Sequence, residues 1–284
     1  EPSPIKTGDL DYRFLHGKTR EVLLLELSPV RKRAYHGRVA QALESFLGDL
    51  ASQQASTLAE HYQAAGEWTQ AYRYWIQAGV RHRQLLSPAE AWRAFTTAGT
   101  ILERIRSQLS DEDIYRLYDP WIAAAYETHE LITLQQLNAD LLSLGEQRKS
   151  PWLIGVALHR LGEESLVHRD YAQGLAYIEQ AIPYLAEAGR VGDRLRALTS
   201  AGVLLCRLNR WSEARERLQL ALAPGADAYD PQAIQAHGQA HFQISLLESW
   251  MGAPLRGREF ASRALSDCTK APYPYGQACA YLAL

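Results

Sequence analysis

One pattern of small and large residues recurs along this chain and restricts what it can fold into. In its clearest copy, which runs from Leu58 to Ala78, the small residue Ala59 precedes a turn at Gly66. After the turn come an aromatic residue and then a small residue, followed by a large apolar residue at +4 and another small one at +7. Small residues let two antiparallel helices approach closely, and the large residue fills the wedge between them. Since neither helix can bury its apolar face alone, such pairs stack, and the pattern predicts an all-α solenoid of antiparallel helix pairs.

Further copies of the pattern follow along the chain. The small residues that mark them are Gly174, Ala214 and the weaker Gly257, and a poorer copy is centred on Leu137. These positions lie further apart than the 34 residues of a common two-helix repeat, which predicts longer helices and looser turns. One more helix, from Pro88 to about Arg106, falls outside the pattern. Its Ala91 follows Ala71 closely, so we expect these two helices to pair.

The composition excludes several classes of protein. Apolar residues make up 47% of the chain and charged residues 22%, which is too apolar for a disordered protein. The formal net charge of −2 lacks the basic excess that a dedicated nucleic-acid surface needs. Three widely spaced cysteines indicate neither a disulfide framework nor a zinc site, and reduced thiols favour the cytoplasm. No apolar run reaches the roughly 18 residues that cross a membrane.

The first 48 residues differ from the repeats. Residues 12–16 predict a short strand, residues 18–27 an amphipathic helix, and residues 30–46 a second helix after a break at Ser28-Pro29. The residues of this segment that carry a resemblance to a known family are Phe14, His16, Leu27-Ser28-Pro29, Arg31, Arg33, His36, Val39-Ala40 and Leu43-Glu44. The segment resembles the junction between the winged-helix part of STAND-type signalling ATPases and their tetratricopeptide repeat (TPR) arms. The Leu58–Ala78 copy resembles the TPR itself. We therefore expect a junction over residues 1–48, which ends a winged-helix-like domain, and a TPR-like array over residues 49–284.

The resemblance also implies a function. STAND-type ATPases include bacterial LuxR-like and SARP-like transcription activators. By resemblance, this chain is the non-catalytic sensor and protein-interaction arm of such a regulator. Its ATPase domain would lie in cis, upstream of Glu1, and its partner would be a protein or a small-molecule effector. The missing initiator methionine and the helical pattern that stops at Leu284 favour a fragment truncated at its C-terminus. A TPR adaptor for peptide segments, the regulatory arm of a cyclase or kinase, and self-association stay open as alternatives.

The catalytic and metal-binding patterns of this sequence are incomplete. Gly17-Lys18-Thr19 lacks the glycine that a phosphate-binding loop carries five residues earlier. His237 and His241 share a helix face, but position 238 is Gly where a zinc protease has its Glu. The basic cluster around Arg31 and Arg38 lies in the junction, where phosphate contact is a weaker interpretation than a solvated helix start. We expect no catalytic site, metal, cofactor, membrane contact or direct nucleic-acid contact in this chain.

The activity that we expect is recognition of a ligand or peptide in a concave groove lined by the first helix of each pair. Arginines there would hold a carboxylate or phosphate, and aromatic residues would supply a flat apolar contact. Repeat register places the following residues on that face: Gln53, Glu60, Gln63, His159, Glu163, Arg196, Thr199, Arg207, Phe242 and Trp250.

Overall fold

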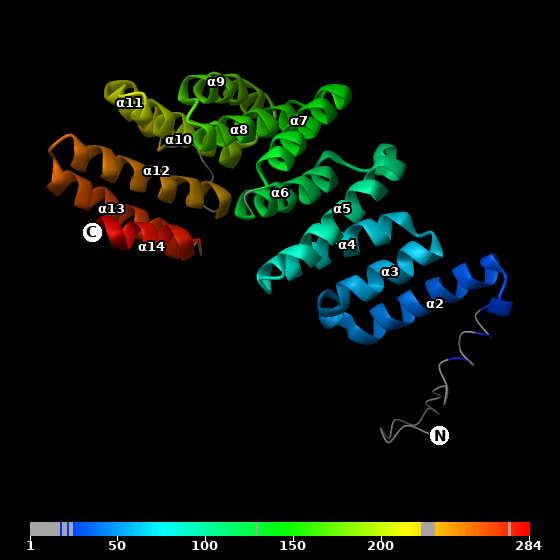
Figure 1. Cartoon of the computed structure of the whole chain (residues 1–284). Helices are drawn as coiled ribbons and strands as arrows, with labels where there is room; N and C mark the ends of the chain where they lie inside the picture. Colours follow the sequence, from blue (N-terminus) through cyan, green and yellow to red (C-terminus); the bar gives the residue numbers. More distant parts are fainter. Residues whose placement is uncertain (1–17, 19–21, 23–24, 129, 223–230, 272–273) are drawn as a thin grey trace. The chain divides into compact units, whose positions relative to one another are not determined.

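The computed structural model describes residues 18, 22, 25–128, 130–222, 231–271 and 274–284. These residues form helices and turns, and no strand occurs among them, so the all-α prediction is confirmed there. The predicted strand over residues 12–16 and half of the predicted helix over residues 18–27 lie outside the described part. Packing divides the chain into two compact units, Glu1–Thr128 (unit 1) and His129–Leu284 (unit 2) (Figure 1).

In unit 1, each helix packs on its neighbours in the sequence. Its elements are α2 (Pro29–Leu47), η1 (Gly48–Gln54), α3 (Ala55–Ala65), α4 (Trp68–Gln84), α5 (Pro88–Ile105), η2 (Arg106–Gln108) and α6 (Asp111–Glu127). The pair α3/α4 is the clearest copy of the sequence pattern. As expected, α5 packs against α4, the helix that holds Ala71. The serine caps at Ser28 and Ser110 start α2 and α6, each by accepting a backbone N–H of the first turn.

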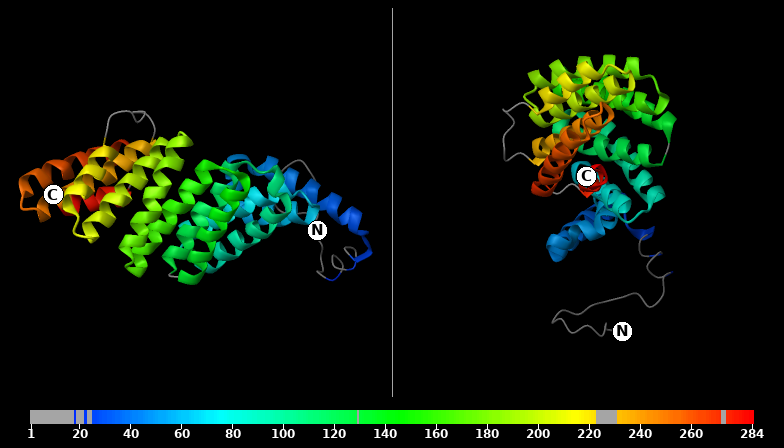
Figure 2. Two further views of the ribbon diagram at one scale, coloured as in Figure 1. Left: turned by 90° about the horizontal axis from the view of Figure 1, so that it is seen from above. Right: turned by 90° about the vertical axis from the view of Figure 1, so that its left-hand side faces the viewer.

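Unit 2 is built from successive helix pairs. Its elements are α7 (Leu131–Arg148), α8 (Pro151–His168), α9 (Tyr171–Glu187), α10 (Val191–Arg207), α11 (Trp211–Ala221), α12 (Pro231–Trp250), α13 (Pro254–Lys270) and α14 (Pro274–Ala283). The pairs α8/α9, α10/α11 and α12/α13 follow one another along the unit (Figure 2), as the repeats predict. The poorer copy is divided, because its first helix is α6 of unit 1 and its second is α7 of unit 2.

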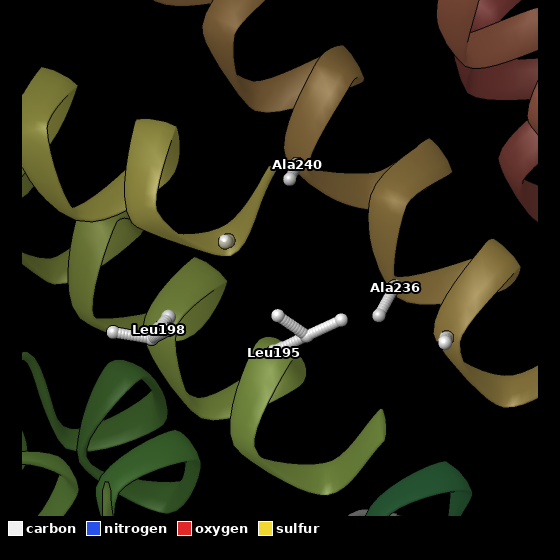
Figure 3. Packing of buried hydrophobic residues seen from close by; sticks show 6 residues of the cluster. Leu195, Leu198, Ala236 and Ala240 are labelled. Carbon is white, nitrogen blue, oxygen red and sulfur yellow. The ribbon is translucent and has the colours of Figure 1, made fainter. Parts of the chain in front are cut away.

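Small residues meet large ones where the two helices of a pair cross. A Cβ at Gly202 of α10 would lie 2.5 Å from Cγ of Leu218 on α11, so only glycine fits there. Gly162 of α8 faces Ile178 of α9 in the same way. Neighbouring pairs are joined by a second set of apolar residues. Figure 3 shows one such contact, in which the leucines of α10 meet alanines of α12 that lie one helical turn apart.

The helix that ends the predicted junction is tied to the first repeat by polar side chains. Glu44 of α2 accepts hydrogen bonds from the phenol groups of Tyr62 on α3 and Tyr74 on α4. His36 of α2 also lies with its Nδ1 2.9 Å from Nδ1 of His61 on α3. α2 therefore packs as part of unit 1. The division that packing defines falls after Thr128, and the boundary predicted at residue 48 stays a prediction.

Two helices of unit 2 end at a non-glycine residue in the left-handed conformation. The chain leaves α8 through Arg169 with φ +60° and leaves α7 through Lys149 with φ +52°. Non-glycine residues adopt this left-handed conformation at some cost, and polar residues do so at several helix ends here. The helix α7 itself continues past Gly145 and ends at Arg148.

Candidate partner-binding surface

Two long-range hydrogen bonds join the first helices of successive pairs in unit 2. Nε1 of Trp152 on α8 donates to Oδ2 of Asp193 on α10 at 2.9 Å. About two turns further along the same helix, Nε2 of His159 lies 3.0 Å from the hydroxyl of Ser200. Both bonds link residues 41 positions apart, because equivalent positions of neighbouring repeats lie side by side.

Charged side chains surround these two bonds. Glu163 lies one turn after His159, with Oε1 3.5 Å from Nε2 of the imidazole, and it also accepts from Ser200 at 3.4 Å. Its other oxygen is 3.3 Å from Nη1 of Arg160. Arg196 donates to Asp193 one turn away on α10. We call this set, His159, Arg160, Glu163, Asp193, Arg196 and Ser200, the α8–α10 polar surface.

The interior and the rim of the α8–α10 polar surface differ in exposure. The side chains of His159 and Asp193 are only 8% and 6% exposed, whereas those of Arg160, Arg196 and Glu163 are 23%, 31% and 37% exposed. The buried groups thus hold the charged tips in place at the surface. A carboxylate and two guanidinium groups held in this way can form hydrogen bonds of both kinds with a polar partner.

Burial sets the protonation of the central histidine. It lowers the pKa of His159 below the ordinary value, and the positive charges of Arg160 and Arg196 act in the same direction against the opposing pull of Glu163. For Glu163, burial alone would raise the pKa. The neighbouring His159 and arginines outweigh it, so the pKa of the carboxyl falls below its ordinary value. At neutral pH the site therefore holds a neutral imidazole beside an ionised carboxylate.

A cation–π contact fixes one end of the surface. Cζ of Arg190 lies 3.6 Å from the centroid of the Trp152 ring, and that ring is buried while its N–H is held by Asp193. The arginine belongs to the turn between α9 and α10, so the contact connects this turn to α8. Such a contact stabilises the orientation of both groups.

The structure brings together three of the residues predicted for unit 2 and separates the others. His159, Glu163 and Arg196 lie in the α8–α10 polar surface. Thr199 is on the same helix as Arg196, but it is buried and its hydroxyl donates to the carbonyl of Leu195. Its side chain is therefore turned into the packing and does not line a surface.

The remaining predicted residues of unit 2 lie elsewhere. Phe242 is half-buried on α12. Arg207 is exposed at the end of α10, and Trp250 is 58% exposed at the end of α12. The ring of Trp250 meets that of Trp211 edge to face. Arg207 and Trp250 thus belong to the edge where helix pairs turn.

The predicted residues of unit 1 form no comparable network. Gln53 is exposed, and it lies in η1 rather than on a first helix. Glu60 is exposed on α3. Gln63 accepts the indole N–H of Trp75 at 2.7 Å, so its amide joins the two helices of one pair.

Sequence reasoning missed Trp152, Arg160, Asp193 and Ser200. The available signal was the repeat spacing itself, because polar residues about one repeat apart on first helices lie opposite each other. Apolar periodicity, on which the repeats were recognised, does not report such pairs.

Neither a protein-family model nor a curated protein sequence matches this chain. Solved structures do match. A Rap protein complexed with competence and sporulation factor is 10% identical, with 93% of this chain and 77% of that chain covered and a TM-score of 0.52. Cut9, from the APC/C hetero-tetramer Cut9–Hcn1, is 14% identical with 94% and 51% covered and a TM-score of 0.50. PilF of Pseudomonas aeruginosa is 14% identical with 88% and 96% covered and a TM-score of 0.49.

At these identities the likeness shows the fold: the chain is a TPR-like α-solenoid, as the repeat pattern predicts. Within the described residues, no three His, Cys, Asp or Glu side chains gather in a way that could hold a metal ion. The helices of that same part are all too short or too polar to cross a membrane.

Proposed function

We propose that this chain is a non-catalytic interaction arm and that unit 2 recognises a protein partner or effector through the α8–α10 polar surface. The observation that carries the proposal is the network in which buried His159 and Asp193 hold the partly exposed side chains of Arg160, Glu163 and Arg196. A surface held in this way loses little conformational entropy when it binds, which favours affinity.

Two solved relatives in fold support a role in binding. The Rap protein is complexed with competence and sporulation factor, and Cut9 forms a hetero-tetramer with Hcn1. Successive helix pairs create extended surfaces on which several residues can contact one ligand, which is the usual advantage of solenoids.

Charge reversal tests this surface. Arg160→Glu places two like charges beside each other on α8. We expect it to raise the Kd for a partner that binds the parent chain by at least about tenfold. The matched control is Arg194→Glu, which reverses an exposed arginine of α10 outside the network. Equal binding by both variants and the parent would exclude the α8–α10 polar surface, provided that the variants melt within about 3 °C of the parent.

The more specific part of the proposal concerns the parent protein. We infer from the junction elements at residues 14–44, followed directly by the Leu58–Ala78 repeat, that the arm belongs to a STAND-type ATPase that regulates transcription. In such a protein the effector or partner would bind one conformation of the arm better than the other and so shift the ATPase between two states. The bonds from Glu44 to α3 and α4 support this, because they make the junction helix move with the first repeat.

The coding sequence upstream of Glu1 tests this part. We expect it to contain Gly-x-x-x-x-Gly-Lys-Ser/Thr at a strand–helix turn. Removal of residues 50–284 from the whole protein should then abolish the effector response and leave nucleotide binding intact. An upstream region without the phosphate-binding loop would exclude the ATPase and leave a TPR adaptor for peptide segments.

A further inference from the structure

An exposed apolar patch lies where two turns of unit 2 meet. Trp211 begins α11 and Trp250 ends α12, and their ring centroids are 6.1 Å apart. Beside Trp250, Met251 is 46% exposed, and Leu255 at the start of α13 is 77% exposed. The ends of α11, α12 and α13 that carry these residues lie at the left of unit 2 in Figure 1. These four residues and the neighbouring Arg215 and Arg256 form a set of six that we call the turn patch.

A buried carboxylate organises the charge of the turn patch. Glu248 has 4% of its side chain exposed, and its Oε1 lies 2.8 Å from Nη2 of Arg215. The same nitrogen lies 3.3 Å from Sδ of Met251. Arg256 approaches the other carboxylate oxygen at 4.0 Å, while its own side chain stays 69% exposed. The negative charge is therefore inside and the guanidinium groups are outside, so the surface presents positive charge beside exposed apolar side chains.

The neighbouring turn adds to this charge. Arg207 ends α10 just before Trp211 and is exposed, and no ion pair reaches it within the described part of the chain. Arg210 of the same turn is neutralised by Glu213, whose carboxylate it contacts at 2.5 Å. Arg207, Arg215 and Arg256 thus outnumber the carboxylate that is paired with them in the described residues, which is Glu248.

We propose that the turn patch docks an acidic segment of a partner protein that carries large apolar side chains. Tryptophan, methionine and arginine are enriched at the centres of protein interfaces, and an exposed cluster of them marks an interaction site. The apolar residues would supply most of the affinity, and the arginines would attract and orient the acidic partner. A nucleic acid could use the arginines, but it would leave Met251 and Leu255 without an apolar contact, which favours a protein.

This site is separate from the α8–α10 polar surface and does not rest on the function proposed for it. The turn patch lies on α11, α12 and α13 and contains no residue of the polar network. It assigns Trp250, which the repeat register placed in the groove, to an edge of the solenoid.

Selection from a random peptide library tests the proposal. A phage-displayed library of 16-residue peptides is panned against the whole chain of 284 residues. We expect enriched peptides to carry a net negative charge and at least one aromatic or large aliphatic residue. Fluorescence anisotropy with labelled peptides should show that Trp250→Ala and Arg256→Glu each raise Kd at least about tenfold. Replacing the acidic residues of the peptide by their amides should raise Kd to a similar degree.

Two control variants keep the test specific. Leu282→Ala removes an apolar side chain that is 89% exposed on α14, and Arg194→Glu reverses an exposed charge on α10. Both should leave Kd within about twofold of the parent. The proposal is overturned if no peptide is enriched, if the enriched peptides are neutral or basic, or if Trp250→Ala binds them as well as the parent. Peptides lost with Arg160→Glu and kept with Trp250→Ala would support the α8–α10 polar surface and overturn the turn patch.

Discussion

Glu44 is the residue whose removal should most clearly loosen the junction helix. Its Oε1 accepts the phenol of Tyr74 at 2.6 Å, and its Oε2 accepts the phenol of Tyr62. The two rings stack with centroids 5.6 Å apart, and both tyrosines are buried, at 2% and 7% exposure. Burial, followed by the hydrogen bond to Glu44, raises the pKa of each phenol, so both hydroxyls stay protonated and donate.

The cost of Glu44→Leu follows from these two bonds. A hydrogen bond to a charged group contributes about 1.5–3 kcal/mol, and a buried hydroxyl left without its partner loses that contribution. Glu44 is half-buried, so water can replace part of each bond. We therefore expect a loss of about 3 kcal/mol in the free energy of separating α2 from α3 and α4. Glu44→Gln keeps an acceptor oxygen but removes the charge, so it should cost about 1 kcal/mol.

Hydrogen–deuterium exchange measures this loss locally, which matters because a chain of two units need not unfold in one step. Amides of α2 over residues 36–47 should exchange about 100-fold faster in Glu44→Leu and about fivefold faster in Glu44→Gln. Amides of α12, in unit 2, serve as the internal reference and should be unchanged.

A double-phenylalanine background provides the decisive comparison. With Tyr62→Phe and Tyr74→Phe already in place, no phenol needs Glu44, and Glu44→Leu should cost less than about 0.5 kcal/mol. If Glu44→Leu accelerated exchange equally in both backgrounds, the hydrogen bonds would not be the cause and the reasoning would be refuted.

Three further predictions concern packing, ionisation and backbone conformation. Gly202→Ala should destabilise unit 2 by about 1–2 kcal/mol, because the new Cβ would lie 2.5 Å from Cγ of buried Leu218. Gly37→Ala, whose new Cβ would have its nearest neighbour at 3.6 Å, should stabilise α2 by about 0.5–1 kcal/mol. Urea titrations measure both changes. Burial raises the pKa of Tyr72 above its usual value of about 10, so the stability that its protonated hydroxyl contributes is complete below pH 10 and is lost as the pH rises above it. In Tyr72→Phe the free energy of unfolding should therefore fall less steeply above pH 10, by about 1.4 kcal/mol per pH unit. An unchanged slope in pH-dependent unfolding would contradict this. Leu86 is 88% exposed at φ +56°, so Leu86→Gly should raise stability by about 0.5–1 kcal/mol in thermal melts, and a lower melting temperature would show that its side chain has a contact after all.

Helices and their pairing could be predicted from the sequence because they depend on local rules. Two helices begin after the serine caps Ser110 and Ser150. Others are followed by glycines with positive φ, a conformation common at helix ends: Gly66, Gly189 and Gly252. Contacts within a pair also involve residues close in sequence, so their small–large pattern is visible in a short window.

The candidate surfaces could be predicted only in part. Repeat register placed His159 and Glu163 on one face correctly, because residues four apart on a helix are neighbours. It could not show that Thr199 turns inward or that Trp250 leans on Trp211, because both depend on how one pair is rotated against the next. That rotation results from many side-chain contacts summed over the interface, and no local pattern encodes it.

What the sequence determines and what only the tertiary structure decides thus depend on how far apart in the chain the interacting residues lie. Its all-α solenoid character follows from the sequence alone, since helix propensity, capping and the small–large pattern act within about one repeat. The bonds from Trp152 to Asp193 and from His159 to Ser200, and the arginines gathered over buried Glu248, exist only in the folded unit. They join residues tens of positions apart, and only the packing of successive pairs brings such residues within hydrogen-bonding distance.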